Sequence, residues 1–285
     1  MTATTDLDAF WGAWPLFQDA ILTGTCAGVL LGVLGVYVVL GRMVFLTAAL
    51  SQTAGLGVTL AFAAQIYLGV SETIASSLVG ASVLTLGSLL LIWNNQERDR
   101  FRRDSMLGLL FLVGSAGTLV VSSKIVQELH DVQTLLFGSS VAVLPGDFRL
   151  VFGFGLGVLC LHLWCWRGFV EVVFDQDTAL IRGIPVQVLK AVLLVTVALS
   201  VSLCTRVLGA LPSFAFSVFP AMAAVIWAPN IPRAMGIAAV IGGACGFLGY
   251  LAAFLYEVPV GPSQALVGAA IWCVLGAASW VIKGR

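Results

Sequence analysis

The sequence predicts an all-α, polytopic membrane protein with about 8–9 transmembrane helices. Of the 285 residues, 60% are hydrophobic and only 10% are charged, and the mean hydropathy is +1.04. The apolar residues form long continuous runs, and a helix needs roughly 20 such residues to cross a hydrocarbon core about 30 Å thick. A transmembrane barrel is excluded because its strands alternate apolar and polar residues.

Each apolar run is an expected span. The runs fall at 16–40, 44–69, 73–93, 105–123, 148–166, 187–207, 212–228, 234–256 and 263–282. The run at 212–228 is short and contains Pro212 and Pro220, so we expect that this crossing can be broken or re-entrant. The glycine-rich patches at 28–35 and 236–249 favour close packing between helices.

Residues 1–15 are expected to form an interfacial segment, and residues 16–285 a single transmembrane domain. The N-terminus is acidic and lacks the basic start and cleavage site of a secretory signal, while Trp11 and Trp14 suit headgroup depth.

The basic residues predict the orientation of the chain in the membrane. With the N-terminus outside and the C-terminus cytoplasmic, the links at 41–43, 94–104, 167–186 and 229–233 face the cytoplasm. Eleven of the 14 arginines and lysines then lie on that side. This bias is the one that cytoplasmic loops show in membrane proteins.

Catalytic motifs are absent from the sequence. It contains no GxxxxGK[ST] phosphate loop, no HExxH and no GxSxG, so we expect no enzyme and no cofactor, with any ATP hydrolysis on a partner. The 14 acidic and 14 basic residues cancel, so nothing indicates a nucleic-acid partner.

Polar residues within the second run are candidates for a translocation pathway, because polar groups are costly in lipid and therefore often functional. These candidates are Ser51, Gln52, Thr53 and Thr59. Gln52 and Thr59 are seven residues apart and share a helix face. The alternative for Gln52 is a hydrogen bond that holds two helices together.

A second cluster invites a soft-metal hypothesis. Cys160, His162 and Cys165 lie close in sequence, and thiolate and imidazole groups suit zinc or copper. Only residues 162 and 165 are neighbours on a helix, so the alternative is a histidine packed at a helix interface.

The stretch FDQDTALIRGIP, residues 174–185, is polar and lies between two apolar runs on the arginine-rich side. It is either a plain connector or a contact for a partner. Asp175 is placed to cap a short helix. Gly183 and Pro185 suit a tight exit into the next span.

Several segments together resemble the permease subunit of zinc/manganese-type ABC importers. The segments are GRMVFLTAALSQTAGLGVTLAF (41–62), LLFGSSVAVLPGD (135–147), Phe174–Pro185, VLGALPSFAFSVFPAMAA (207–224) and VPVGPSQALV (258–267), with a weaker match at Asp104–Gly108. The order and spacing of these segments match the family over most of the chain.

The resemblance implies a permease like those of type II ABC importers, working by alternating access in the inner or plasma membrane of a prokaryote. It implies a homodimer within the membrane lipid, a cytoplasmic ATPase subunit and an extracytoplasmic substrate-binding protein. Segment 170–186 would be the coupling segment, whose contact residues are Phe174, Asp175, Ala179, Gly183 and Pro185.

The chain departs from the family pattern in the second run. Ala48 and Gln52 stand where the family has an aspartate and a histidine, the residue types that bind a divalent cation. Zinc or manganese is the expected cargo, with a non-metal or chelated-metal cargo as the alternative. A membrane scaffold without transport is the alternative from another class.

Overall fold

The computed structural model describes residues 10–71, 74–94, 100–125, 143 and 145–283, and the ordered elements of these residues are helices. Their bounds are α2 (Trp14–Leu40), α3 (Val44–Leu68), α4 (Ser77–Asn94), α5 (Arg100–Ile125), α7 (Pro145–Trp164), α8 (Trp166–Phe174), α9 (Gln176–Ile181), α10 (Val186–Leu208), α11 (Ala210–Trp227), α12 (Ile231–Tyr256) and α13 (Val260–Lys283). The predicted all-α membrane fold is confirmed.

Among the described helices, nine are long and apolar enough to cross a membrane, which is the upper value that the sequence predicted. The expectation of a broken or re-entrant crossing at 212–228 is wrong. Helix α11 continues through Pro220, and Pro212 lies in its first turn, where a backbone N–H has no partner within the helix.

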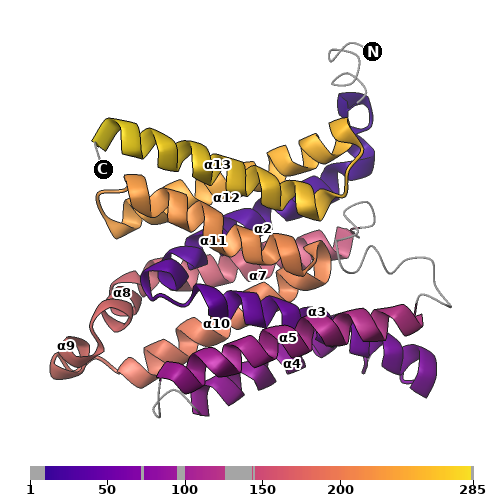
Figure 1. Cartoon of the computed structure of the whole chain (residues 1–285), viewed down its shortest axis with the longest axis horizontal. Coiled ribbons are helices and arrows are strands. Elements are labelled where there is room, and N and C mark those ends of the chain that lie inside the picture. Colours follow the sequence, from indigo (N-terminus) through magenta and orange to yellow (C-terminus); the bar gives the residue numbers. More distant parts are fainter. Residues whose placement is uncertain (1–9, 72–73, 95–99, 126–142, 144, 284–285) are drawn as a thin grey trace.

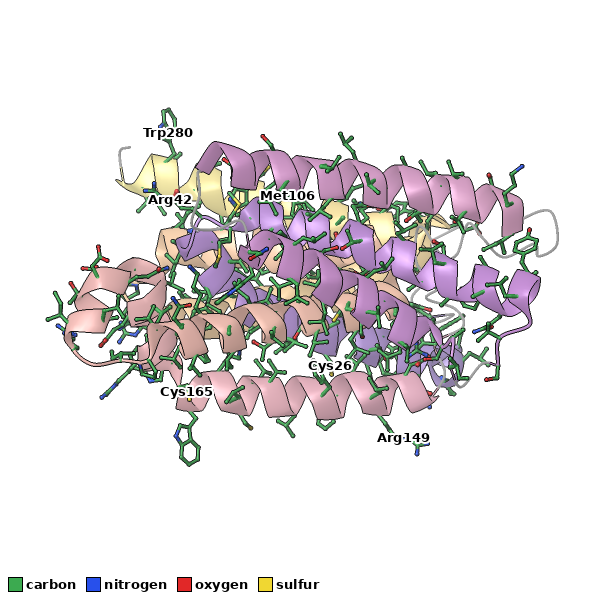
Figure 2. The ribbon with its side chains drawn as sticks, turned by 90° about the horizontal axis from the view of Figure 1, so that it is seen from below. Cys26, Arg42, Met106, Arg149, Cys165 and Trp280 are labelled. Atoms are coloured by element: carbon green, nitrogen blue, oxygen red, sulfur yellow. The ribbon has the colours of Figure 1, made fainter. Side chains whose placement is uncertain are left out.

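The first and the last described helix end the chain on opposite sides of the bundle, as an odd number of crossings requires. The start of α2 lies at one end, and the last turn of α13 lies at the other end together with α8 and α9 (Figure 1). Arg42, Cys165 and Trp280 lie toward that second end, whereas Arg149 lies toward the first (Figure 2). The second end is therefore the one that the arginine distribution assigns to the cytoplasm.

Helix α2 is the centre of the bundle. In its most apolar stretch, 78% of the residues are buried. The corresponding share in α13 is only 6%, and this helix lies at an edge (Figure 1). Helix α2 packs against α12, α11 and α7, while α3 packs against α4 and α5. Helix α10 contacts members of both groups and joins them into one core.

Glycines allow a close crossing in the bundle core, as the two glycine-rich patches predicted. Gly28 of α2 faces Gly242 of α12, and a Cβ atom on either residue would clash with the carbonyl oxygen of the other. The two backbones are thus in contact along this crossing, which is the usual role of small residues between membrane helices.

Aromatic side chains pack the N-terminal end onto the bundle. Phe10 is buried against Phe254, with ring centroids 5.3 Å apart, while Trp11 is 59% exposed. Residues 1–9 lie outside the described residues, so the interfacial position of residues 1–15 stays a prediction.

Candidate functional site

The predicted coupling segment, 170–186, contains the end of one short helix, α8, and the whole of a second, α9. Helix α8 directly follows the membrane-spanning α7, and α9 follows α8 after the single residue Asp175. Helix α8 is amphipathic: it buries Phe169 and Val172 against the bundle and leaves Arg167 exposed. The segment therefore projects from the cytoplasmic end as a folded unit (Figure 1).

Asp175 is the N-cap of α9, as predicted. Its carboxylate accepts hydrogen bonds from the backbone N–H of Thr178, at 3.0 Å, and from the Thr178 hydroxyl. These two hydrogen bonds hold the pKa of Asp175 below its usual value, because they stabilise the ionised carboxylate. The capped helix begins in a defined position relative to α8.

Ala179 has a different place from the one expected of a contact residue. It is only 1% exposed and packs with Val172 of α8 and Val186 of α10 in a small apolar cluster. Its side chain is covered by its own chain, so it seats α9 on α8 and α10 and offers no surface to a partner.

The exit from α9 is a tight turn, as Gly183 and Pro185 predicted. Gly183 has a φ of +75°, a conformation that glycine adopts without steric cost. The backbone N–H of Ile184 donates to the Ala179 carbonyl at 3.0 Å, and Pro185 is the N-cap residue of α10. The turn leads the chain directly from α9 into a membrane span.

One ion pair ties α9 back to α8. The Arg182 guanidinium lies 3.3 Å from a carboxylate oxygen of Glu171. Both side chains are partly or largely exposed, so the pair contributes little energy but restricts the orientation of the segment.

The tip of the segment presents exposed apolar side chains, of which only Phe174 was predicted from the sequence as a contact residue. Phe174 is 60% exposed, Leu180 57% and Ile181 87%. Apolar residues inside a polar, cytoplasmic stretch were the signal that could have found Leu180 and Ile181. Exposed apolar side chains on a charged cytoplasmic segment are typical of a protein-docking surface.

The four pathway candidates of α3 do not form one stripe. Three are buried, and their hydroxyls donate to carbonyl oxygens of their own helix. Ser51 donates to Ala48 at 2.9 Å, Thr53 to Leu50 at 3.1 Å and Thr59 to Leu56 at 2.9 Å.

Gln52 is the candidate that remains half-buried, at the crossing of α3 and α5. Gly114 of α5 permits this crossing, because a Cβ atom there would lie 2.7 Å from the Gln52 carbonyl carbon. A pocket of about 280 Å³ opens at the cytoplasmic end of the same two helices, lined by residues 41–43, Phe45, Leu46, Asp104 and Leu107. Gln52 does not line this pocket, but it is the one of the four candidates that is not buried.

The structure does not bring Cys160, His162 and Cys165 together as metal ligands. Cys160 is exposed, whereas His162 is buried with its Nε2 atom 2.8 Å from the Thr196 hydroxyl. Among the described residues, no group of three or more histidine, cysteine, aspartate or glutamate side chains could hold a metal ion. The geometry fits the alternative of a histidine packed between helices.

The outer end carries an ion pair that the sequence did not signal. The Arg206 guanidinium lies 2.9 Å from an Asp147 carboxylate oxygen and donates to the Ser77 hydroxyl at 2.9 Å. Asp147 ends the segment LLFGSSVAVLPGD, of which residues 135–142 and 144 lie outside the described residues.

Known proteins share this arrangement over nearly the whole length of the chain. The model of the ABC 3 transport family matches residues 13–278. The chain belongs to the ABC 3 transport family. The predicted family resemblance is therefore confirmed, and this family member is a multi-pass protein of the cell membrane.

Relatives agree with that assignment, and a solved structure shares the fold. The manganese transport system membrane protein MntC of Halalkalibacterium halodurans is 25% identical over 92% of the chain and 87% of its own length. The chelated iron transport system membrane protein YfeD of Yersinia pestis is 25% identical over 92% of the chain and 85% of its own. The structure of PsaBC from Streptococcus pneumoniae in complex with Fab matches with a TM-score of 0.81 at 22% identity, over 94% and 95% of the two chains.

Proposed function

We propose that this family member is the membrane-spanning permease of an ATP-driven importer for a divalent transition metal, with manganese and zinc as the first cargoes to test. The observation that carries the proposal is the apolar tip of Phe174, Leu180 and Ile181 on a folded cytoplasmic segment. The sequence has no phosphate loop, so the ATP that drives transport is hydrolysed by a separate subunit that docks at this tip.

The coupling segment is suited to transmit a movement of the ATPase to the membrane-spanning helices. Asp175 fixes the start of α9, Ala179 packs it on α8 and α10, and the Gly183 turn connects it to a span without a flexible linker. A displacement of α9 therefore moves membrane-spanning helices and shifts the equilibrium between inward-open and outward-open states.

The complex we propose has two copies of this permease, the ATPase below them and a substrate-binding protein on the outer side. The weakly buried helices α5 and α13, 22% and 6% buried, leave apolar faces for a second permease copy or for lipid. Gln52 lies on the pathway beside α5.

Substitution of the exposed tip tests the proposal. Ile181→Asp places a charge on a side chain that is 87% exposed, so the fold is preserved while the apolar contact with the ATPase is lost. The matched control is Tyr256→Asp, because Tyr256 is 76% exposed but lies at the end of α12 on the outer side.

The readouts are co-purification with the ATPase and uptake of manganese or zinc into proteoliposomes. We expect Ile181→Asp to abolish both and Tyr256→Asp to retain both. An intact, active complex with Ile181→Asp would refute the docking surface. A wild-type complex without manganese or zinc uptake would refute the free-metal cargo, and a wild-type permease that binds no ATPase would favour a scaffold.

A chelated-metal or non-metal cargo is the second candidate, favoured by the second span. Ala48 and Gln52 provide neither the carboxylate nor the imidazole of the family pattern, and an amide oxygen is a poor ligand for transition metals. Uptake assays with free and chelated metal ions side by side decide between the two cargoes.

A further inference from the structure

Helices α7 and α10, which flank the coupling segment in the sequence, are joined by a buried hydrogen bond near the cytoplasmic end. His162 of α7 is 1% exposed, and its Nε2 lies 2.8 Å from Oγ1 of Thr196 in α10. The Thr196 hydroxyl oxygen also lies 2.8 and 2.9 Å from the carbonyl oxygens of Val192 and Leu193. The imidazole Nε2 and the Thr196 hydroxyl are thus joined across the two helices by a hydrogen bond whose donor is set by the imidazole tautomer.

The same imidazole anchors the base of the coupling segment. Its ring stacks on Phe169 of α8, with centroids 4.5 Å apart and planes at 23°. Tyr37 of α2 meets Phe169 edge-on at 5.8 Å, and its hydroxyl donates to the His162 carbonyl at 3.4 Å. Phe169 is fully buried in this three-ring cluster, so α8 cannot shift without moving α7.

A second polar contact joins α7 and α10 at the outer end. Arg206 of α10 pairs with Asp147 of α7 at 2.9 Å, and the two side chains are only 22% and 18% exposed. The Arg206 guanidinium also donates to Ser77 at the start of α4. A polar contact thus joins α7 and α10 near the cytoplasmic end of the two spans and another joins them at the outer end.

We infer that α7, α8 and α10 form one rigid frame that carries the coupling segment, with His162 and Arg206 as positioning residues. Sliding of α7 along α10 requires both polar contacts to break, and polar groups without partners are costly at membrane depth. A displacement of α9 then tilts α7 and α10 together, because the two spans do not slide relative to each other. The transport part of this inference rests on the proposed function, whereas the rigidity of the frame does not.

The rigidity is measured on the permease alone. Spin labels at the exposed native Cys160 of α7 and at Val188→Cys of α10, which is 59% exposed, report the distance between the helices in nanodiscs, with the other cysteines replaced. We expect a narrow distance distribution that broadens clearly in Thr196→Val with Arg206→Gln. An unchanged distribution in this double variant would overturn the frame.

The coupling is measured in the complete complex, as manganese ions transported per ATP hydrolysed. Thr196→Val keeps the side-chain shape and removes the hydrogen bond, so we expect transport per ATP to fall roughly two- to tenfold, the range one hydrogen bond supplies. Ser200→Ala is the matched control, because Ser200 lies one turn further along α10 and its buried hydroxyl has no hydrogen-bond partner among the described residues.

A charge exchange tests the outer contact. We expect Arg206→Asp to uncouple hydrolysis from transport and the exchange Asp147→Arg with Arg206→Asp to restore most of the coupling. Equal coupling ratios in wild type, Thr196→Val and Arg206→Asp would overturn the positioning role. If the wild-type permease binds no ATPase, the proposed function fails, and the distance measurement still decides on the frame.

Discussion

Asp175 accepts a hydrogen bond from the backbone N–H of Thr178 at 3.0 Å, and this contact sets where α9 begins. Removal of the carboxylate by Asp175→Ala leaves the first turn without its cap, so we expect α9 to fray and the ATPase to bind more weakly. Hydrogen exchange of the amides at 179–182 and titration with the ATPase check both effects. Unchanged exchange would show that packing alone orders the helix.

The same cap predicts a pH dependence. The pKa of Asp175 is held below its ordinary value of 3.8, so its stabilising contribution is present above that value and is lost as the pH falls through the lowered pKa. Asp175→Asn keeps a side-chain oxygen that can accept the bond without titrating. The protection factors of the α9 amides, which correct for the intrinsic pH dependence of exchange, should therefore fall at acid pH in wild type, and the Asn variant should show no such step.

Burial of Ala179 makes α9 sensitive to side-chain size at that position. In Ala179→Leu the added atoms meet Val172 and Val186, so we expect α9 to be displaced at a cost of about 1–3 kcal/mol and the ATPase to bind roughly tenfold more weakly. Gln176→Leu is the control, because Gln176 is exposed on the same helix. Equal affinities of the two variants would argue against a seating role for Ala179.

The contact of Gly28 with Gly242 predicts a large effect of a single methyl group. Gly28→Ala places a Cβ against the Gly242 carbonyl, and the two backbones must separate, so we expect a loss of about 1–3 kcal/mol in the free energy of unfolding. Gly87→Ala in α4 has no atom within 4 Å of the new Cβ and should be neutral or slightly stabilising. Thermal unfolding in detergent compares the two; similar midpoints would contradict the close crossing.

A substitution of Gln52 should affect transport without affecting assembly of the complex. We expect Gln52→Ala to change the uptake rate while the complex still assembles, because the side chain is half-buried at the α3–α5 crossing. Thr59→Val is the control, since the Thr59 hydroxyl is buried and bonded to its own helix. Unchanged uptake in Gln52→Ala would remove this residue from the pathway.

The variant Gln52→His tests whether the cargo is a free or a chelated metal ion. An imidazole at this position restores one ligand of the family pattern. We expect stronger metal-dependent stimulation of the ATPase in this variant than in wild type. Stimulation by chelated metal alone in both proteins would identify a chelated cargo.

The sequence by itself determined the class, the spans, the orientation and the family of this protein. Apolar runs are decisive because lipid offers backbone groups no hydrogen-bond partner, so each run must be a helix that closes its own hydrogen bonds. The cap at Asp175 and the turn at Gly183 were also predictable, because both depend on local backbone geometry. Pro220 was misleading, because the packed surroundings of α11 keep the helix continuous.

The tertiary structure alone decided which side chains are available for function. Ala179 lies in the predicted contact segment but is buried, and Ile181, two residues later, is the most exposed of the apolar residues at the tip. His162 stands between two cysteines in the sequence, yet its hydrogen bond goes to Thr196 and its ring stacks on Phe169. Such contacts join residues far apart in the chain, and they depend on how helices cross, which the period of an apolar run does not specify.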